Sequence, residues 1–159
     1  MCLPYIDVLF GIEPYHLWKD EQDHQTGDVK DGVPFQPDFK QQDEVFHGFV
    51  KRYPNIKCIA RHVRYAHSCS ENSLMAYLWY DGKTYESQKL RFHILDRVGG
   101  GDAFVSGIIY ALMNEYKPQD IADFGVAESA VKHTIHGDGN ITDDVSLIEH
   151  IMQMNFDIK

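Results

Sequence analysis

The chain has 159 residues, of which 43% are hydrophobic, so it can bury one sizeable core and we expect a single domain over residues 1–159. The formal net charge of −9 and the absence of a Lys/Arg-rich run in the sequence argue against nucleic-acid binding. The first residues lack the pattern of a secretory signal, and no apolar stretch approaches the ~20 residues of a membrane span, so we expect a cytoplasmic protein without a membrane partner.

Cysteine and histidine spacing gives little sign of a disulfide scaffold or a metal centre. Cys2, Cys58 and Cys69 form an odd-numbered set without a Cys-x-x-Cys pair, as expected for free thiols in a reducing compartment. The 9 histidines include no His-Glu-x-x-His pair, and we predict no metal ligands among them. A histidine-based metal-binding protein stays open as an alternative.

The first part of the chain predicts a strand, a helix and a strand in succession. Residues 5–10 form an apolar, β-prone run typical of a buried strand. Residues 19–42 are polar and lack an apolar period, which predicts a long surface loop, ordered or partly disordered. Asp43 is the predicted N-cap of a helix over residues 44–52, and residues 56–63 predict the next strand. This order indicates a parallel crossover unit.

The rest of the chain predicts a hairpin followed by helices. Two β-prone runs, residues 74–80 and 83–90, are separated by Asp81-Gly82, a dipeptide that accepts the positive φ of a tight turn. We therefore expect these runs to pair in antiparallel fashion. Apolar periodicity and capping residues then predict three helices, over residues 102–116, over residues 118–135, and from Thr142 as N-cap.

Residues 94–107 carry the chemical information: a strand end, a glycine turn and the start of an amphipathic helix. Gly99, Gly100 and Gly101 remove every Cβ from the turn, so backbone amides can converge on an anion at the helix N-terminus. Asp102 would repel a phosphate that the site merely binds. It is well placed, however, to take a proton from a hydroxyl that attacks a γ-phosphoryl group. A common Gly-rich turn with an ordinary helix-capping acid is the alternative that these residues leave open.

Residues 96–104, Asp-Arg-Val-Gly-Gly-Gly-Asp-Ala-Phe, closely resemble the C-terminal signature of the ribokinase-like (PfkB) carbohydrate kinases, Asp-Thr-x-Gly-Ala-Gly-Asp-Ala-Phe. The resemblance extends through residues 105–116 and 121–133 to the Gly-Asp-Gly-Asn turn at 137–140, and upstream to the predicted hairpin turn. It implies the C-terminal portion of a three-layer α/β/α sandwich, with a mostly parallel sheet, an antiparallel hairpin and no lid. Within the family, the general similarity is greatest to 2-keto-3-deoxygluconate kinases.

The resemblance also implies roles for individual residues. Asp102 would be the catalytic base, and the amides of Gly99, Gly100 and Gly101 would form the anion hole for the transferred phosphoryl group. Asp96 would shape the turn and lie near a monovalent cation, and Mg²⁺ would arrive with ATP. The weaker candidates for contacts with the adenine are Arg61, Ala130 and His133.

The sequence departs from the family pattern at several places. Arg97 stands where the family usually has Thr and Gly100 where it usually has Ala, and both changes keep the backbone amides. The Asn-x-x-Glu motif is not seen, since the matching residues 12–15 are Ile-Glu-Pro-Tyr, in which Glu13 could substitute at a shifted position. The expected Gly-x-x-Gly loop is replaced by residues 64–72, so we expect altered nucleotide contacts there.

The resemblance implies ATP-dependent phosphorylation of a hydroxyl on a sugar or sugar acid, with 2-keto-3-deoxygluconate as the expected substrate. Family members carry a comparable stretch ahead of Met1 that holds the first Gly-rich motif and the lid. We therefore expect impaired activity of this chain alone, and association with a second copy or with a separate N-terminal segment. The alternatives are a non-catalytic nucleotide-binding remnant and, from another class, the histidine-based metal-binding protein.

Overall fold

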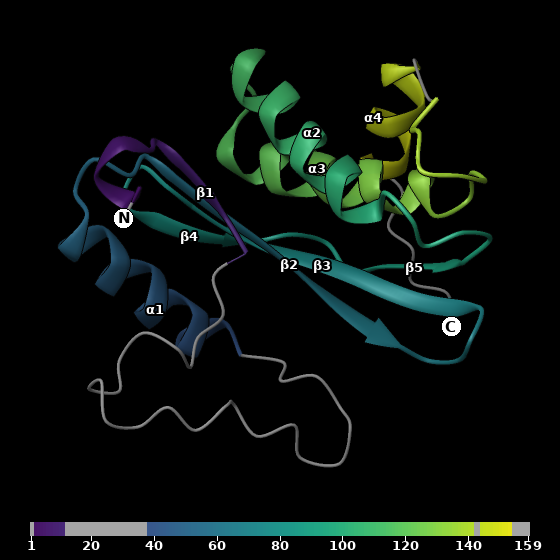
Figure 1. Ribbon diagram of the computed structural model, residues 1–159, viewed down its shortest axis with the longest axis horizontal. Coiled ribbons are helices and arrows are strands. Elements are labelled where there is room, and N and C mark those ends of the chain that lie inside the picture. Colours follow the sequence, from purple (N-terminus) through teal and green to yellow (C-terminus); the bar gives the residue numbers. More distant parts are fainter. Residues whose placement is uncertain (1, 12–37, 142–143, 154–159) are drawn as a thin grey trace.

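A five-stranded sheet lies between two layers of helices in the computed structural model, which describes residues 2–11, 38–141 and 144–153 (Figure 1). Helix α1 covers one face of the sheet, and α2, α3 and α4 cover the other (Figure 1). This is the predicted α/β sandwich. The elements in chain order are η1 (Leu3–Tyr5), β1 (Val8–Phe10), α1 (Phe39–Arg52), β2 (Cys58–Ala66), β3 (Glu71–Tyr80), β4 (Lys83–Glu86), β5 (Leu90–His93), α2 (Gly100–Met113), α3 (Pro118–Lys132) and α4 (Val145–Gln153).

Strand β3 is the centre of the sheet. It pairs in antiparallel fashion with β2 along one edge and with both β4 and β5 along the other. Strand β1 pairs with β2 in parallel, which confirms the predicted crossover unit. Asp81 and Gly82, both with positive φ, form the turn of the predicted hairpin.

The expectation of a mostly parallel sheet is wrong for the described strands, because only β1 and β2 pair in parallel. The physical reason is the length of the connection after β2. Only residues 67–70 separate β2 from β3, and the amide of His67 donates to the carbonyl of Glu71 at 3.0 Å. A parallel pairing needs a crossover of about a dozen residues or more, so these two strands form a long hairpin.

The predicted strand over residues 83–90 is two short strands, β4 and β5. The break falls at Ser87, whose amide donates to the carbonyl of Ala76 at 2.9 Å and whose hydroxyl accepts from the amide of Ala76 at 2.8 Å. The chain therefore stays on the same edge of β3 while it changes register. It then leads through β5 toward the glycine turn.

Helix boundaries differ from the predicted ones where local capping decides them. Helix α1 begins five residues earlier than expected, because Asp38 and not Asp43 is the N-cap and forms a capping box with Gln41. The end of the predicted loop at 19–42 is thus helical, while residues 12–37 lie outside the described residues.

The helices after the glycine turn also differ at their ends from the prediction. Helix α2 begins at Gly100 and ends before Glu115, whose φ of 56° stops it, while α3 ends at Lys132. At α4 the carboxylate of Asp144 accepts from the amide of Leu147 at 3.2 Å and takes the capping role predicted for Thr142, which lies outside the described residues.

The alternation of side chains along β2 and β3 decides which residues meet the glycine turn. Even-numbered residues such as Leu74 and Leu78 pack in the core below α2 and α3, together with Phe104. Odd-numbered residues such as Met75 and Trp79 pack against α1 in the second core. Because the side-chain period of a strand is two, neighbouring residues of β2 lie on opposite faces.

Candidate functional site

The glycine turn joins β5 to α2, and its three glycines have different surroundings. Gly99 is the N-cap of α2 with φ of 77°, and a Cβ added there would lie 2.4 Å from the carbonyl oxygen of Asp138. A Cβ on Gly100 would lie 2.3 Å from Cε1 of His133, whereas one on Gly101 would meet no atom within 4 Å. Only Gly99 belongs to the turn proper, because Gly100 and Gly101 are already helical, which corrects the expectation of a three-residue glycine turn.

The amides at the start of α2 are the groups that an anion could bind. The first helical bond runs from the amide of Ala103 to the carbonyl of Gly99 at 2.9 Å. The amide of Gly100 donates to the carbonyl of Arg97 at 3.4 Å, a long and weak bond. The amides of Gly101 and Asp102 have no acceptor within the helix, as is general for a first turn. Both residues are exposed, so these two amides are the most accessible to a ligand.

Asp102 occupies the third position of α2, and its side chain is exposed. The carboxylate therefore stands beside the free amides of the first turn and not in the core. An acid at this position also interacts favourably with the helix dipole, which is a structural role by itself. The geometry thus permits Asp102 to meet a ligand at the helix N-terminus.

Asp96 connects the turn to the loop that follows α3. One carboxylate oxygen accepts from the amide of Val98 at 3.0 Å and the other from the amide of Gly137 at 2.9 Å. These two bonds, with a further contribution from the positive charge of Lys132, hold the pKa of Asp96 below its ordinary value. Asp96 therefore joins the residues before the glycine turn to the loop after α3.

Lys132 was not among the residues predicted from the sequence. Its side chain is 0% exposed, and Nζ donates to the carbonyl of Ile135 at 3.1 Å and to that of Gly137 at 2.7 Å. A Cβ on Gly99 would lie 3.1 Å from its Cε. A lysine in the last turn of a helix normally complements the dipole from the solvent side, so this burial could not be predicted from the sequence.

His133 and Ser129 support the start of α2 from below. The Ser129 hydroxyl donates to the carbonyl of Gly100 at 2.8 Å, and Nδ1 of His133 lies 2.6 Å from the carbonyl of Ser129. Burial lowers the pKa of His133, which favours a neutral ring that donates from Nδ1 to this carbonyl. The carbonyl of His133 accepts the amides of Leu95 and Asp96. His133 thus lies beside the glycines, as a buried packing partner.

The other two adenine candidates are not brought to the turn. Ala130 is buried in the core between α3 and the sheet. Arg61 is 8% exposed, lies on the α1 face, and donates from a guanidinium nitrogen to the side-chain oxygen of Gln42 at 2.7 Å. Since the glycine turn lies on the opposite face, the prediction that Arg61 contacts the adenine does not match its position.

His62 and Arg64, also in β2, lie on the face of the sheet that α2 covers. The ring of His62 lies 4.9 Å from that of Phe104 in the first turns of α2. Burial lowers the pKa of His62 and of His133, and the positive charge of Arg64 lowers both further. Arg64 is exposed and pairs in register with Leu74, a residue of the α2-side core. Its charge acts on His133, which lies beside the start of α2, and sequence reasoning missed this because the predicted strand ended at residue 63.

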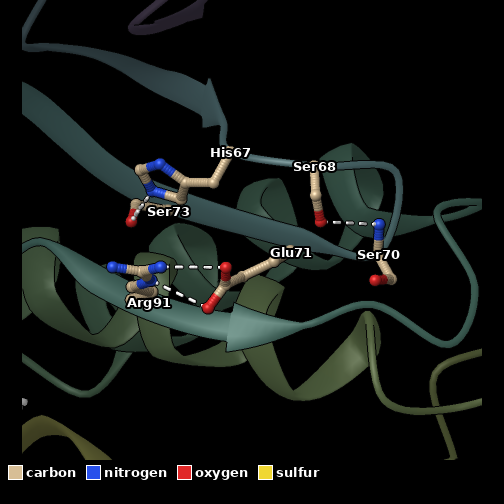
Figure 2. Close-up of polar contacts among 6 residues, drawn as sticks. All are labelled: His67, Ser68, Ser70, Glu71, Ser73 and Arg91. Atoms are coloured by element: carbon tan, nitrogen blue, oxygen red, sulfur yellow. Dashed lines mark hydrogen bonds and ion pairs between the residues drawn. The ribbon is translucent and has the colours of Figure 1, made fainter.

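Residues 64–72, which replace the expected Gly-x-x-Gly loop, form the end of β2, the turn and the start of β3. Figure 2 shows the polar contacts there: Arg91 donates twice to the carboxylate of Glu71, each time at 2.9 Å, and His67 bonds to the hydroxyl of Ser73 at 2.8 Å. Arg97 donates to the carbonyl of Cys69 at 3.0 Å. The hairpin end is thus tied to the residues just before the glycine turn.

Within residues 2–11, 38–141 and 144–153, no three or more His, Cys, Asp or Glu side chains gather as they would around a metal ion. In the same part of the chain, no helix has the length and apolar character to cross a membrane.

Comparison with known proteins places this geometry in a class. The solved structure of a PfkB family carbohydrate kinase from Listeria grayi matches 94% of this chain at 25% identity with a TM-score of 0.70. A 2-dehydro-3-deoxygluconokinase from Thermotoga maritima matches 95% of it, also at 25% identity, with a TM-score of 0.76. Each match covers 42% of the solved chain. The protein therefore has the ribokinase-like fold of carbohydrate kinases over part of their length.

A more particular likeness is to the sugar-acid kinases of this class. The name 2-dehydro-3-deoxygluconokinase is a synonym of 2-keto-3-deoxygluconate kinase, so the likeness to the Thermotoga maritima enzyme agrees with the sequence prediction. A curated relative, the 5-dehydro-2-deoxygluconokinase of Clostridium botulinum, is 31% identical over 71 residues, which are 45% of this chain and 20% of the relative. No family model matches the chain.

Proposed function

We propose that this chain is the nucleotide-binding and catalytic portion of a kinase that phosphorylates a sugar or sugar acid at the expense of ATP. The observation that carries the proposal is the exposed carboxylate of Asp102 beside the free amides of Gly101 and Asp102 at the start of α2. A base and an anion-binding group at one helix end are the two elements that phosphoryl transfer to a hydroxyl needs.

In the proposed reaction, Asp102 accepts the proton of the attacking hydroxyl. The hydroxyl oxygen forms a bond to the γ-phosphorus of ATP, the bond from this phosphorus to the β–γ bridging oxygen breaks, and ADP leaves. Mg²⁺ that arrives with ATP would neutralise charge on the phosphates. The free amides of Gly101 and Asp102 at the start of α2, and the guanidinium of Arg64, stabilise the charge on the transferred group.

For the substrate we propose 2-keto-3-deoxygluconate, supported by the likeness to the Thermotoga maritima kinase. The relative named for 5-dehydro-2-deoxygluconate supplies the competing sugar acid for a substrate test. Because the chain spans 42% of the solved relatives, we expect it to bind Mg-ATP but to turn over slowly by itself. The sugar contacts and the exclusion of water would come largely from the part of the fold that these residues do not match.

The test combines Mg-ATP calorimetry with sugar-dependent ADP release for the wild-type chain, Asp102→Asn and Asp120→Asn. Asp120 is a matched control, because it occupies the third position of α3 as Asp102 does in α2. We expect Asp102→Asn to lower turnover by about 10²- to 10⁴-fold with Mg-ATP binding retained, and Asp120→Asn to leave turnover within about twofold of the wild type.

Equal turnover of Asp102→Asn and the wild type would contradict the catalytic assignment. Mg-ATP binding without ADP release on either sugar acid would instead favour the second candidate, a nucleotide-binding remnant. The short coverage of the relatives is the observation that favours this candidate.

A further inference from the structure

The charge buried most completely beneath the glycine turn is the ammonium of Lys132. It is the last residue of α3, and its side chain is fully shielded from solvent. Nζ donates to the carbonyls of Ile135 and Gly137, three and five residues farther along the chain. A buried ammonium is costly unless polar partners replace its water, so these carbonyls are a requirement for its position.

The carboxylate of Asp96 is linked to this ammonium through Gly137. Gly137 bonds to both groups, since its carbonyl accepts from Lys132 and its amide donates to Asp96. The charge of Lys132 is close enough to lower the pKa of Asp96, after the larger effects of the two amide bonds. Two carbonyl oxygens and a nearby carboxylate are the oxygen environment that a hard cation prefers.

The resemblance implied a monovalent cation near Asp96, and the residues present do not fit one. The carbonyls of Ile135 and Gly137 are already bonded to a side chain that carries the same charge as such an ion. A second cation at this place would be repelled by the ammonium and would find these oxygens engaged.

We propose that the ammonium of Lys132 takes the place of a monovalent cation and makes the glycine turn independent of K⁺. The tethered charge holds residues 135–137 beneath Gly99, where the carbonyl of Asp138 also closes on the turn. Lys132 is a positioning residue in this proposal, since it acts through the turn and not on the substrate. The proposal rests on the function proposed above, because its main readout is nucleotide binding.

The experiment compares Mg-ATP binding and the thermal unfolding midpoint of the 159-residue chain in KCl, methylammonium chloride and choline chloride at equal ionic strength. We expect the wild-type Kd to agree within about twofold in all three salts. Lys132→Ala leaves a space for a small cation, so we expect at least about tenfold weaker binding in choline, recovered in KCl or methylammonium. Lys117→Ala removes an exposed lysine at the other end of the same helix and should match the wild type.

Several results would overturn the proposal. Wild-type binding that tightens more than about tenfold from choline to KCl would show that a free cation is required. A folded Lys132→Ala variant with the same defect in every salt would reduce Lys132 to a packing role. If Lys132→Ala does not fold, the wild-type comparison decides alone.

Failure of the proposed function gives a different pattern. A wild-type chain that binds no Mg-ATP in any salt contradicts the kinase proposal, while the unfolding midpoints still test the role of Lys132. Midpoints of Lys132→Ala raised by KCl and methylammonium, but not by choline, support the tethered cation. A wild-type midpoint raised by KCl relative to choline opposes it.

Discussion

The first turns of α2 and α3 carry an acid at the same position but differ in what surrounds it. Each helix has an acid at its third position, Asp102 in one and Asp120 in the other. In α3 the first residue is Pro118, which has no amide hydrogen, and Gln119 donates to the carbonyl of Glu86 and to the carboxylate of Asp123. That first turn is bound to the rest of the fold. The first turn of α2 instead keeps an exposed acid beside free amides.

The comparison teaches that an acid in a first turn is not by itself a sign of chemistry. The difference lies in the residues around the acid. The glycines at the start of α2 have no side chains that would cover its amides, and Lys132, Ser129 and His133 at the end of α3 lie against this turn. Substitutions of these glycines would separate the residues that support the turn from those that form the binding surface.

Gly99→Ala should have the largest effect on stability. Alanine at φ of 77° is strained, and its Cβ would meet the backbone of Asp138. We expect a loss of about 3 kcal/mol in the free energy of unfolding, measured by urea denaturation. Gly82→Ala is the matched control, because Gly82 has φ of 81° with open space around it, and we expect a loss of about 1 kcal/mol there. Equal losses would contradict the contact with Asp138.

Gly100→Ala should cost about 2 kcal/mol, because the added methyl group overlaps the ring of His133. The ring of His133 thus gives a physical reason for glycine at this position. In a double-mutant cycle with His133→Ala, we expect the alanine at position 100 to be tolerated, with a coupling of about 1–2 kcal/mol. Additive effects would show that the ring is not the obstacle.

Only the local part of the site could be predicted from the sequence. The motif at residues 96–104 predicted a glycine turn that leads into a helix with Asp102 in its first turn, because consecutive residues fix this local geometry, but Gly100 and Gly101 belong to the helix and not to the turn. It could not predict that Arg64 lies on the α2 face of the sheet, because the predicted strand ended at residue 63 whereas β2 extends to Ala66. It also missed the burial of Lys132, whose partners are carbonyls in an irregular loop and leave no side-chain pattern.

In the fold, too, only part could be predicted from the sequence. The crossover unit of β1, α1 and β2 and the turn at Asp81-Gly82 follow from local patterns. The long pairing of β2 with β3 does not, because the polar residues 64–72 hide the end of one strand and the start of the next.

Asp96→Asn should destabilise the chain in a pH-dependent manner. The pKa of Asp96 is lowered in the folded state, so its carboxylate contributes stability above its ordinary pKa of about 3.9 and loses it as the pH falls through the lower folded value. The unfolding midpoint of Asp96→Asn should therefore lie below that of the wild type near pH 6, with a difference that shrinks below about pH 4. A difference that stays constant down to pH 3 would contradict the role of the two amide bonds.

Gly101→Ala should have the smallest effect on the fold and the opposite sign. A Cβ there meets no atom within 4 Å, and alanine is a better helix former than glycine, so we expect a gain of up to about 1 kcal/mol in the free energy of unfolding. The same Cβ would stand beside the free amides of α2, where the proposed phosphoryl group approaches, and Mg-ATP binding should weaken several-fold. Gly139→Ala, also in open space, should leave binding unchanged. Stabilised but fully binding Gly101→Ala would mean that the phosphates lie elsewhere. Stabilisation coupled to weaker binding would show that glycine is kept at position 101 for the ligand, in contrast to Gly99 and Gly100, which the fold itself requires.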